Sequence, residues 1–262
     1  AAQMARAATG GRPAVFKAIR NGGCHSRTEL TRQLTYLTTK SSYVFDALGQ
    51  YDGQEVLSPK QIEEMTERFA SAWDPARRTK LGHTSHLLMS FPIGTKPEAV
   101  RDVARGVVQQ FFQGEGSRFD YIVAVHTDRA HTHAHVVLNR HSPDGEMFYL
   151  RSGHHFSYEL FREAMVEHGD KHGLRLEATR RLDRGVLTYE ARSSEVQQAR
   201  AARHERPVER QRVGADLEQA HRHVALASLT YRGLAGAASH EGFEQVSQAL
   251  MRASLTLANN GV

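Results

Sequence analysis

Apolar positions follow two kinds of spacing along the first two thirds of the chain. Apolar residues three and four apart predict helices that begin near Ser26, Ser58, Thr95 and Phe156. Alternating or continuous apolar runs predict strands at 14–19, 84–91, 121–126, 132–138 and 146–150. Because strands and helices are interleaved, the pattern indicates a mixed α/β (α+β) domain.

The first three of these helices have an N-terminal signature. In each, a serine or threonine precedes a glutamate or glutamine by three residues, the spacing of a capping box: Ser26 and Glu29, Ser58 and Gln61, Thr95 and Glu98. We therefore expect Ser26, Ser58 and Thr95 to be N-caps.

The pattern also divides the chain. Residues 1–12 have the character of a loose lead-in, and 13–189 form the folded domain. From 190 to 214 arginines are frequent and large apolar side chains are scarce, which predicts a basic linker or an exposed helix. Residues 215–262 become rich in alanine and leucine and predict a helical C-terminal segment.

Composition narrows the class of protein. The net charge of +5 over 262 residues favours a polyanionic partner. A single cysteine, Cys24, excludes an intrachain disulfide framework and a thiolate zinc cluster, and it suits a reducing compartment. No apolar run has the length of a membrane span, and the start of the chain lacks the apolar middle of a secretory signal. We expect a cytoplasmic protein without membrane insertion.

Four of the sixteen histidines fall on or beside two neighbouring predicted strands. Alternate residues of a strand share a face, so His131, His133 and His135 point the same way, opposite to an apolar set. With the turn at Arg129–Ala130, His126 lies directly across from His133. The alternative is a solvated polar face that happens to be rich in histidine.

Three converging imidazoles are the donor set of a divalent metal site. His131 and His135 are about 13 Å apart at Cα on an extended strand, which strains a shared ion. The spacing therefore supports His126, His133 and one of the outer two. Such a site keeps positions open for water or phosphate, and Mg²⁺, Mn²⁺ and Zn²⁺ all remain possible.

Tyr36 lies off the apolar stripe of the helix that begins near Ser26. With Leu30 at zero, Leu34 lies at about 40°, Leu37 at about 340° and Tyr36 at about 240° around the helix axis. Tyr36 is therefore not a core residue of that face. It is either an ordinary exposed tyrosine or a functional one.

Three motifs in order along the chain resemble those of the HUH relaxases that mobilise plasmids. The pattern His-x-Asp-x-x-His-x-His-x-His-Val-Val-x-Asn-Arg at 126–140 is similar to their third motif. The stretch Gln-Leu-Thr-Tyr-Leu at 33–37 resembles the first motif, and 84–95 the second. The resemblance covers about residues 13–190 and is closest to the class that contains the T-DNA border nickase.

The resemblance implies the HUH fold, a central and mainly antiparallel sheet flanked by helices, here with a helical appendage. It implies that Tyr36 attacks single-stranded DNA at an origin of transfer or T-DNA border and forms a 5′-phosphotyrosine during conjugative transfer. It also implies His126, His133 and His135 as the metal ligands, with His131 as an extra histidine. Accessory relaxosome proteins and the coupling protein of a type IV secretion system are the implied partners.

Other residues are candidates for helper roles. Asp128 could orient an imidazole or accept the tyrosine proton, or it could be an ordinary turn aspartate. Ser90 and Asn139 are candidates to contact the DNA backbone or its 3′ end, against plain structural hydrogen bonding. Arg180 and Arg181 are candidates for phosphate contacts, against simple solvation of the surface.

Three other functions are compatible with some of these features. A rolling-circle replication initiator shares the site, but such proteins often carry the tyrosine after the histidines, whereas Tyr36 precedes them. A zinc hydrolase without a covalent step would leave Tyr36 passive. A non-enzymatic origin-binding protein would keep the fold alone. The order of motifs favours a relaxase.

Overall fold

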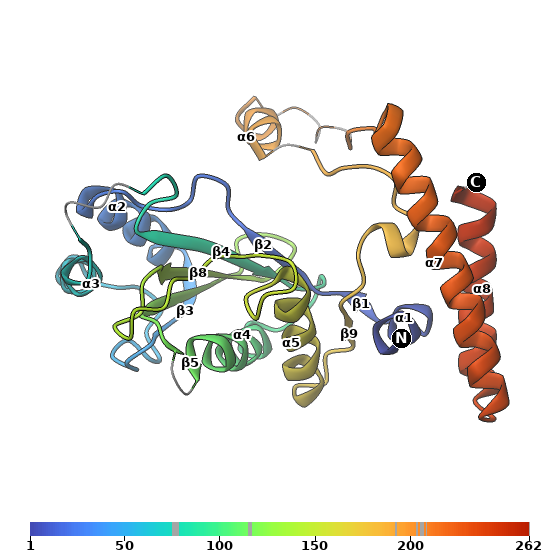
Figure 1. Cartoon of the computed structure of the whole chain (residues 1–262). Helices are drawn as coiled ribbons and strands as arrows, with labels where there is room; N and C mark the ends of the chain where they lie inside the picture. Colours follow the sequence, from blue (N-terminus) through green and yellow to red (C-terminus); the bar gives the residue numbers. More distant parts are fainter. Residues whose placement is uncertain are drawn as a thin grey trace. The chain divides into compact units, whose positions relative to one another are not determined.

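The computed structural model describes residues 1–74, 79–114, 117–191, 193–202, 204, 207 and 209–261. They divide into two compact units. One is Arg12–Ala178, and the other combines Ala1–Gly11 with Thr179–Val262. The first unit carries the sheet with His126, His131, His133 and His135, and the second is helical (Figure 1).

A five-stranded sheet forms the centre of the first unit as described, and every neighbouring pair in it is antiparallel. Its strands lie in the order β2 (Val15–Ala18), β4 (Thr84–Ser90), β8 (His133–Asn139), β7 (Tyr121–His126) and β3 (Ser41–Asp46). Short pairs lie beside it: β1 (Arg12–Pro13) with β9 (Leu176–Glu177), and β5 (Gln113–Gly114) with β6 (Ser117–Arg118). The expected mainly antiparallel α+β fold is confirmed.

Two pairs of helices cover the sheet, one pair on each face (Figure 1). One face packs against α2 (Arg27–Thr38) and α3 (Pro59–Ser71), and the other against α4 (Pro97–Phe112) and α5 (Tyr158–Lys171). The Ser26 and Ser58 hydroxyls accept from the backbone N–H groups of Glu29 and Gln61, so both predicted N-caps are confirmed.

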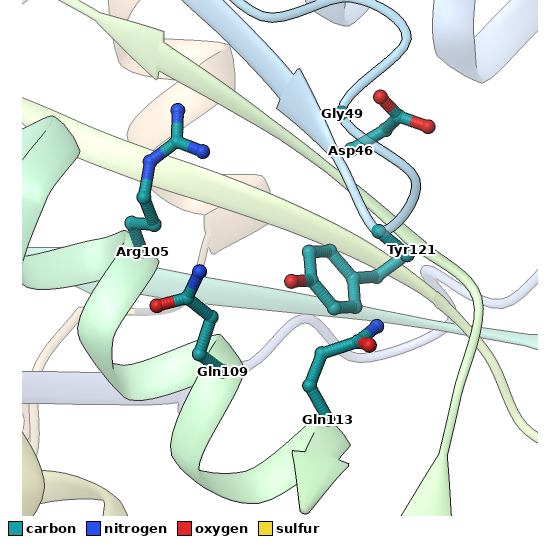
Figure 2. Close-up of a pocket in the computed structure, with 7 residues that line it drawn as sticks. Asp46, Gly49, Arg105, Gln109, Gln113 and Tyr121 are labelled. Carbon is teal, nitrogen blue, oxygen red and sulfur yellow. The ribbon is translucent and has the colours of Figure 1, made fainter.

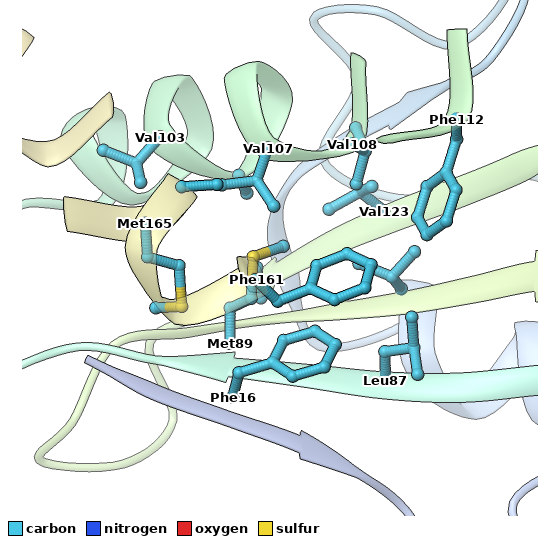
Figure 3. Packing of buried hydrophobic residues seen from close by; sticks show 14 of the residues in the cluster. Phe16, Leu87, Met89, Val103, Val107, Val108, Phe112, Val123, Phe161 and Met165 are labelled. Carbon is cyan, nitrogen blue, oxygen red and sulfur yellow. The ribbon is translucent and has the colours of Figure 1, made fainter. Parts of the chain in front are cut away.

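The α4/α5 face holds the larger apolar core, shown in Figure 3. Val123 and Val136 point into it from β7 and β8, and both are fully buried. Phe112 from α4 and Phe161 from α5 fill the space above them, and the Phe161 ring stacks on Phe16 with centroids 4.3 Å apart. This face is therefore an aromatic and aliphatic layer of the kind that dominates folding energy.

The α2/α3 face is apolar over only part of its area. Ile122, Ala124 and Val137 pack beneath α2 and α3. At the edge of this cluster, Arg68 of α3 forms ion pairs with Asp46 at 2.8 Å and Asp120 at 2.9 Å. Burial raises the pKa of Asp120, while the Arg68 guanidinium acts to lower that pKa. The remaining part of this face carries the histidines.

The structure differs from the sequence analysis at four points of local structure. The strand β3 was not predicted, because Ser41, Ser42 and Asp46 interrupt its apolar pattern. Residues 146–150 form only an isolated bridge and no strand. The hydroxyl of Thr95 donates to the Pro92 carbonyl, and α4 begins after Lys96 without a side-chain cap. The fourth is the expected loose lead-in, which instead contains the helix α1 (Ala2–Ala8).

The second unit is built from helices: α1, the short 3-10 helix η1 (Leu182–Arg184), α6 (Ser193–Ala201), α7 (Gly214–His240) and α8 (Glu244–Gly261). Helices α1, α7 and α8 pack around an apolar cluster that includes Val224, Tyr231 and Leu250. Within the expected basic linker, residues 192, 203, 205–206 and 208 lie outside the described residues. In the part of the chain that is described, no helix is both long and apolar enough to cross a membrane.

Candidate metal centre and nucleophile

Three histidines meet at one end of the α2/α3 face. In the strand register, His126 of β7 lies directly opposite His133 of β8, as the alternation predicted, and His135 follows two residues later. One ring nitrogen from each lies within 4.8 Å of the others. His126 and His133 are only 3% and 4% exposed. Because these donors converge, the trio has the form of a site for one divalent ion.

Two of these rings are held by backbone carbonyls. His126 donates from Nε2 to the carbonyl of Leu37 at 2.7 Å, and His133 donates from Nδ1 to the carbonyl of His131 at 2.9 Å. A neutral imidazole that donates from one nitrogen has its lone pair on the other. Each ring is therefore oriented by the protein and keeps one nitrogen for an ion, the arrangement usual for metal-binding histidines.

The third ring is held by a histidine that the sequence analysis missed. His135 Nδ1 lies 2.8 Å from Nε2 of His86 on β4. On its other side His86 meets the side-chain amide of Gln33 on α2, 3.4 Å away. Only the pairing of β4 with β8 brings His86 and His135 together, so no local spacing signals this contact.

Burial keeps these rings uncharged. Removal from water is the first cause in each case, and it lowers the pKa of His126 and His133, that of His135 to about 2 and that of His86 to about 4. Neutral imidazoles are the form that binds metal. The donor set therefore fits a divalent ion, and three imidazoles suit Zn²⁺ or Mn²⁺ better than Mg²⁺ alone.

His131 does not join this group. It is exposed in the loop between β7 and β8, and its Nδ1 lies 3.0 Å from the carbonyl of Phe91. Among the described residues, the converging set is His126, His133 and His135. These are the three that the resemblance implies.

Tyr36 directly precedes the residue that accepts a hydrogen bond from His126. Tyr36 is on α2, off the buried stripe of Leu30, Leu34 and Leu37, and it is 57% exposed. The next residue, Leu37, gives its carbonyl to His126. The ammonium group of Lys40 lies over the Tyr36 ring, 5.1 Å from its centroid. The hydrogen bond to Leu37 therefore fixes the Tyr36 turn of α2 against the histidine cluster.

Comparison with known proteins decides the family. The family model described as relaxase, MobA/VirD2-like, nuclease domain matches residues 43–174, half of the chain. The chain belongs to this relaxase family. The match contains the three histidines, while Tyr36 lies before its first residue.

Curated relatives of this relaxase are T-DNA border endonucleases named VirD2. That of Agrobacterium fabrum is 31% identical over 222 residues, which cover 78% of this chain and 47% of the relative. That of Rhizobium radiobacter is 30% identical over 191 residues, covering 67% and 44%, and that of Rhizobium rhizogenes is 29% identical over 221 residues, covering 78% and 48%. The relaxase chain thus spans about half the length of these relatives.

Two further predicted residues of the relaxase lie near the histidines. Asp128 is exposed, with Oδ1 4.0 Å from Nε2 of His133. Ser90 is half-buried at the end of β4, directly opposite His133 in the strand register. Residues paired in this way project to the same face, so Ser90 belongs to the histidine face.

The other predicted contacts with DNA have different surroundings. Asn139 is buried, its amide donates to the carbonyl of Phe69, and its oxygen accepts from the Trp73 indole at 2.9 Å. This favours the alternative of structural hydrogen bonding, which ties β8 to α3. Arg180 and Arg181 belong to the second unit, where Arg181 forms ion pairs with glutamates of that unit.

A small pocket of about 390 Å³ lies between α4 and the ends of β3 and β7, and it contains no histidine (Figure 2). Tyr121, Gln109 and Gln113 point into it. Its charged members are already paired, Asp46 with Arg68 and Arg105 with Asp52. These groups stabilise the junction of α4 with the sheet.

Proposed function

We propose that this chain nicks single-stranded DNA by attack of Tyr36 and holds the cut strand as a 5′-phosphotyrosine. The observation that carries the proposal is the hydrogen bond from His126 to the carbonyl of Leu37. It ties a tyrosine that is exposed, and so accessible to a strand, to three neutral imidazoles that converge on one point. The family and its T-DNA border relatives support the same chemistry.

The proposed step is one transesterification. The Tyr36 hydroxyl oxygen forms a bond to phosphorus while the bond from phosphorus to the 3′-oxygen breaks. The phenolic proton leaves, and the departing 3′-oxygen takes up a proton, so that the strand ends in a 3′-hydroxyl. The phosphodiester energy is kept in the tyrosine ester, and the reverse reaction rejoins the strand.

Residues of this chain have distinct parts in that step. His126, His133 and His135 would hold a divalent ion, which when bound supplies Lewis-acid stabilisation of the charge on the phosphate. Asp128 is the candidate to accept the tyrosine proton, because its Oδ1 lies 4.0 Å from Nε2 of His133, the nitrogen left for the ion, and not beside Nδ1, which donates to His131. Lys40, over the Tyr36 ring, adds a positive charge where the phenolate forms.

A single strand is the substrate that this arrangement favours. A duplex presents its backbone on a stiff cylinder, whereas a single strand bends into a recess and splays its bases. We infer that duplex DNA is cut only where it is melted or supercoiled.

The test is a covalent adduct. With a labelled single strand and Mn²⁺, the wild-type protein is expected to give a shifted band on denaturing gels. Tyr36→Phe removes the only nucleophilic oxygen of that side chain and is expected to abolish the band while leaving strand binding within about twofold.

Tyr43→Phe is the control, because the Tyr43 hydroxyl donates to Glu98 on α4 and not to the histidine face. It should form the adduct as the wild type does. An adduct that persists in Tyr36→Phe and disappears in Tyr43→Phe would move the nucleophile to β3.

A further inference from the structure

A large pocket lies at the opposite end of β4 from Ser90. Its volume is about 760 Å³, and the loop after β2, the loop before β4 and residues 148–150 form its walls. These loops are held close together. A Cβ at Gly23 would lie 2.0 Å from the carbonyl oxygen of Leu81, so glycine is required there. The Cys24 N–H donates to the Thr84 hydroxyl at 2.8 Å, which fixes the same contact.

Arg140 lines this pocket and is only 6% exposed. Its guanidinium donates to the carbonyl of Phe148 at 3.1 Å, and no carboxylate of the described residues pairs with it. Burial alone lowers its pKa, with no anion to offset that effect. A buried charge without a counter-charge is costly, so this arginine is arranged to receive an anion.

The rest of the pocket complements a nucleotide. Three positive side chains, Arg20, Lys80 and Arg140, line it against one negative side chain, Glu29, within the described residues. Tyr149 adds a phenol ring that is 40% exposed. The Tyr149 ring is tilted against the His154 ring, with centroids 4.5 Å apart. A guanidinium for a phosphate and a partly exposed aromatic ring for a base are the two elements with which proteins hold single strands.

The pocket is connected to the metal centre. Arg140 directly follows β8, the strand that carries His133 and His135, and it lies five residues beyond His135, roughly 16 Å along the strand. His86 lines the pocket and also contacts His135. If a DNA strand bound with its scissile phosphate at the histidines, a nucleotide next to the cut site, and not the reacting one, would lie in the pocket.

We propose that this pocket binds one nucleotide of the DNA strand, with its phosphate on Arg140 and its base against Tyr149, and so helps to select where the strand is cut. The proposal rests on the proposed nicking function. A free nucleotide would offer the same phosphate chemistry. The strand is favoured because the pocket and the metal centre share His86 as a wall.

The test measures affinity for a fluorescent oligo-dT strand by anisotropy in three variants. Arg140→Met keeps most of the side-chain length and is expected to weaken binding about tenfold, because it removes a charge-assisted contact. The slope of log affinity against log salt should fall by about 0.7, the value for one phosphate contact on a single strand. Lys80→Ala at the exposed rim should act in the same direction, which covers the case that Arg140→Met does not fold. Lys171→Ala, at the opposite end of α5 from Tyr158, which lines the pocket, should bind as the wild type.

Thymidine monophosphate and inorganic phosphate distinguish the source of the phosphate. We expect either to displace the strand only far above the strand's own dissociation constant. Displacement by the monophosphate at strand-like concentrations would instead make this a free-nucleotide site.

Adduct formation over a range of strand concentrations separates the two proposals. Arg140→Met and Lys80→Ala should both need more DNA than the wild type for half-maximal adduct formation, because both residues act on binding, whereas Lys171→Ala should form the adduct as the wild type does. Unchanged strand affinity in both variants of a protein that forms the adduct would overturn the pocket alone. Loss of affinity in both variants of a protein that never forms the adduct would overturn the nicking function alone.

Discussion

The two faces of the central sheet are formed by the same strands but carry different kinds of side chain. On β7 and β8 the residues that face α4 and α5 are all apolar or aromatic: Tyr121, Val123, Val125, Ala134, Val136 and Leu138. Their neighbours on the other face change along the strands, from Ile122, Ala124 and Val137 under α2 and α3 to His126, His133 and His135 at one end. One face is a continuous apolar core, and on the other face the apolar core ends at the three converging histidines.

We expect the two faces to differ in what they contribute: one to the stability of the fold and the other to the binding of metal and DNA. The α4/α5 face buries large side chains without interruption, so it supplies most of the hydrophobic stabilisation. The histidine end buries rings that must stay neutral and hydrogen-bonded, and it adds little apolar area. Variants on the first face should therefore change the free energy of unfolding, and variants on the second should change the binding of metal and strand.

The largest effect is expected from Phe112→Ala. Phe112 is fully buried and packs against Phe119, Phe148 and Phe161. Its truncation should lower the free energy of unfolding by about 3–5 kcal/mol in urea melts, because a large cavity remains. Metal affinity measured by calorimetry at a temperature where the variant is folded should be unchanged. A large loss of affinity in the folded variant would mean that the two faces are coupled.

His133→Ala tests the other face. Removing one of three imidazoles should weaken metal binding by at least about 100-fold, while the midpoint of unfolding without metal changes little. His131→Ala is the matched control, because it removes a histidine from the adjoining loop and leaves the converging set intact. Equal losses in the two variants would show that the ion is not held by the converging trio.

A smaller effect is expected from His86→Leu, which removes the partner of His135 and keeps a similar volume. Metal affinity should fall about tenfold, the low end for loss of a group that orients a ligand. His86→Gln restores a polar group of similar reach and should recover part of that loss. If both variants bind metal as the wild type does, the contact has no role in orienting His135.

The register of the histidines was predictable because the strand period of two puts them on one face, and a turn centred on Arg129–Ala130 then places His126 opposite His133. The contact of His86 with His135 spans 49 residues and depends on the pairing of two strands that are distant in sequence. No period in the sequence specifies that pairing.

A local sequence motif predicted a contact correctly only where the contacting residue was also close in sequence. Ser58 and Gln61 form the expected capping box within one turn of a helix. Thr95 has the same spacing to Glu98, but its hydroxyl turns back to Pro92. Asn139 has the sequence context of a site residue, and its burial between Trp73 and Phe69 is set by the packing of α3 on the sheet.

The smallest effect is expected from Ser90→Ala, which tests how far the proposed DNA-binding surface extends along β4. Ser90 is half-buried opposite His133, so its hydroxyl faces the position proposed for the scissile strand. A hydrogen bond from a hydroxyl that stays partly solvated is worth about 0.5–1.5 kcal/mol net, and its loss should weaken binding of single-stranded DNA by roughly 2–10-fold. The measurement is anisotropy in a Tyr36→Phe background, where the strand is not cut. Ser71→Ala is the control, because that hydroxyl donates to the carbonyl of Arg68 at the end of α3. Wild-type DNA affinity in Ser90→Ala would show that the DNA-binding surface does not extend beyond the histidines. Ser90 would then be only a structural residue of β4.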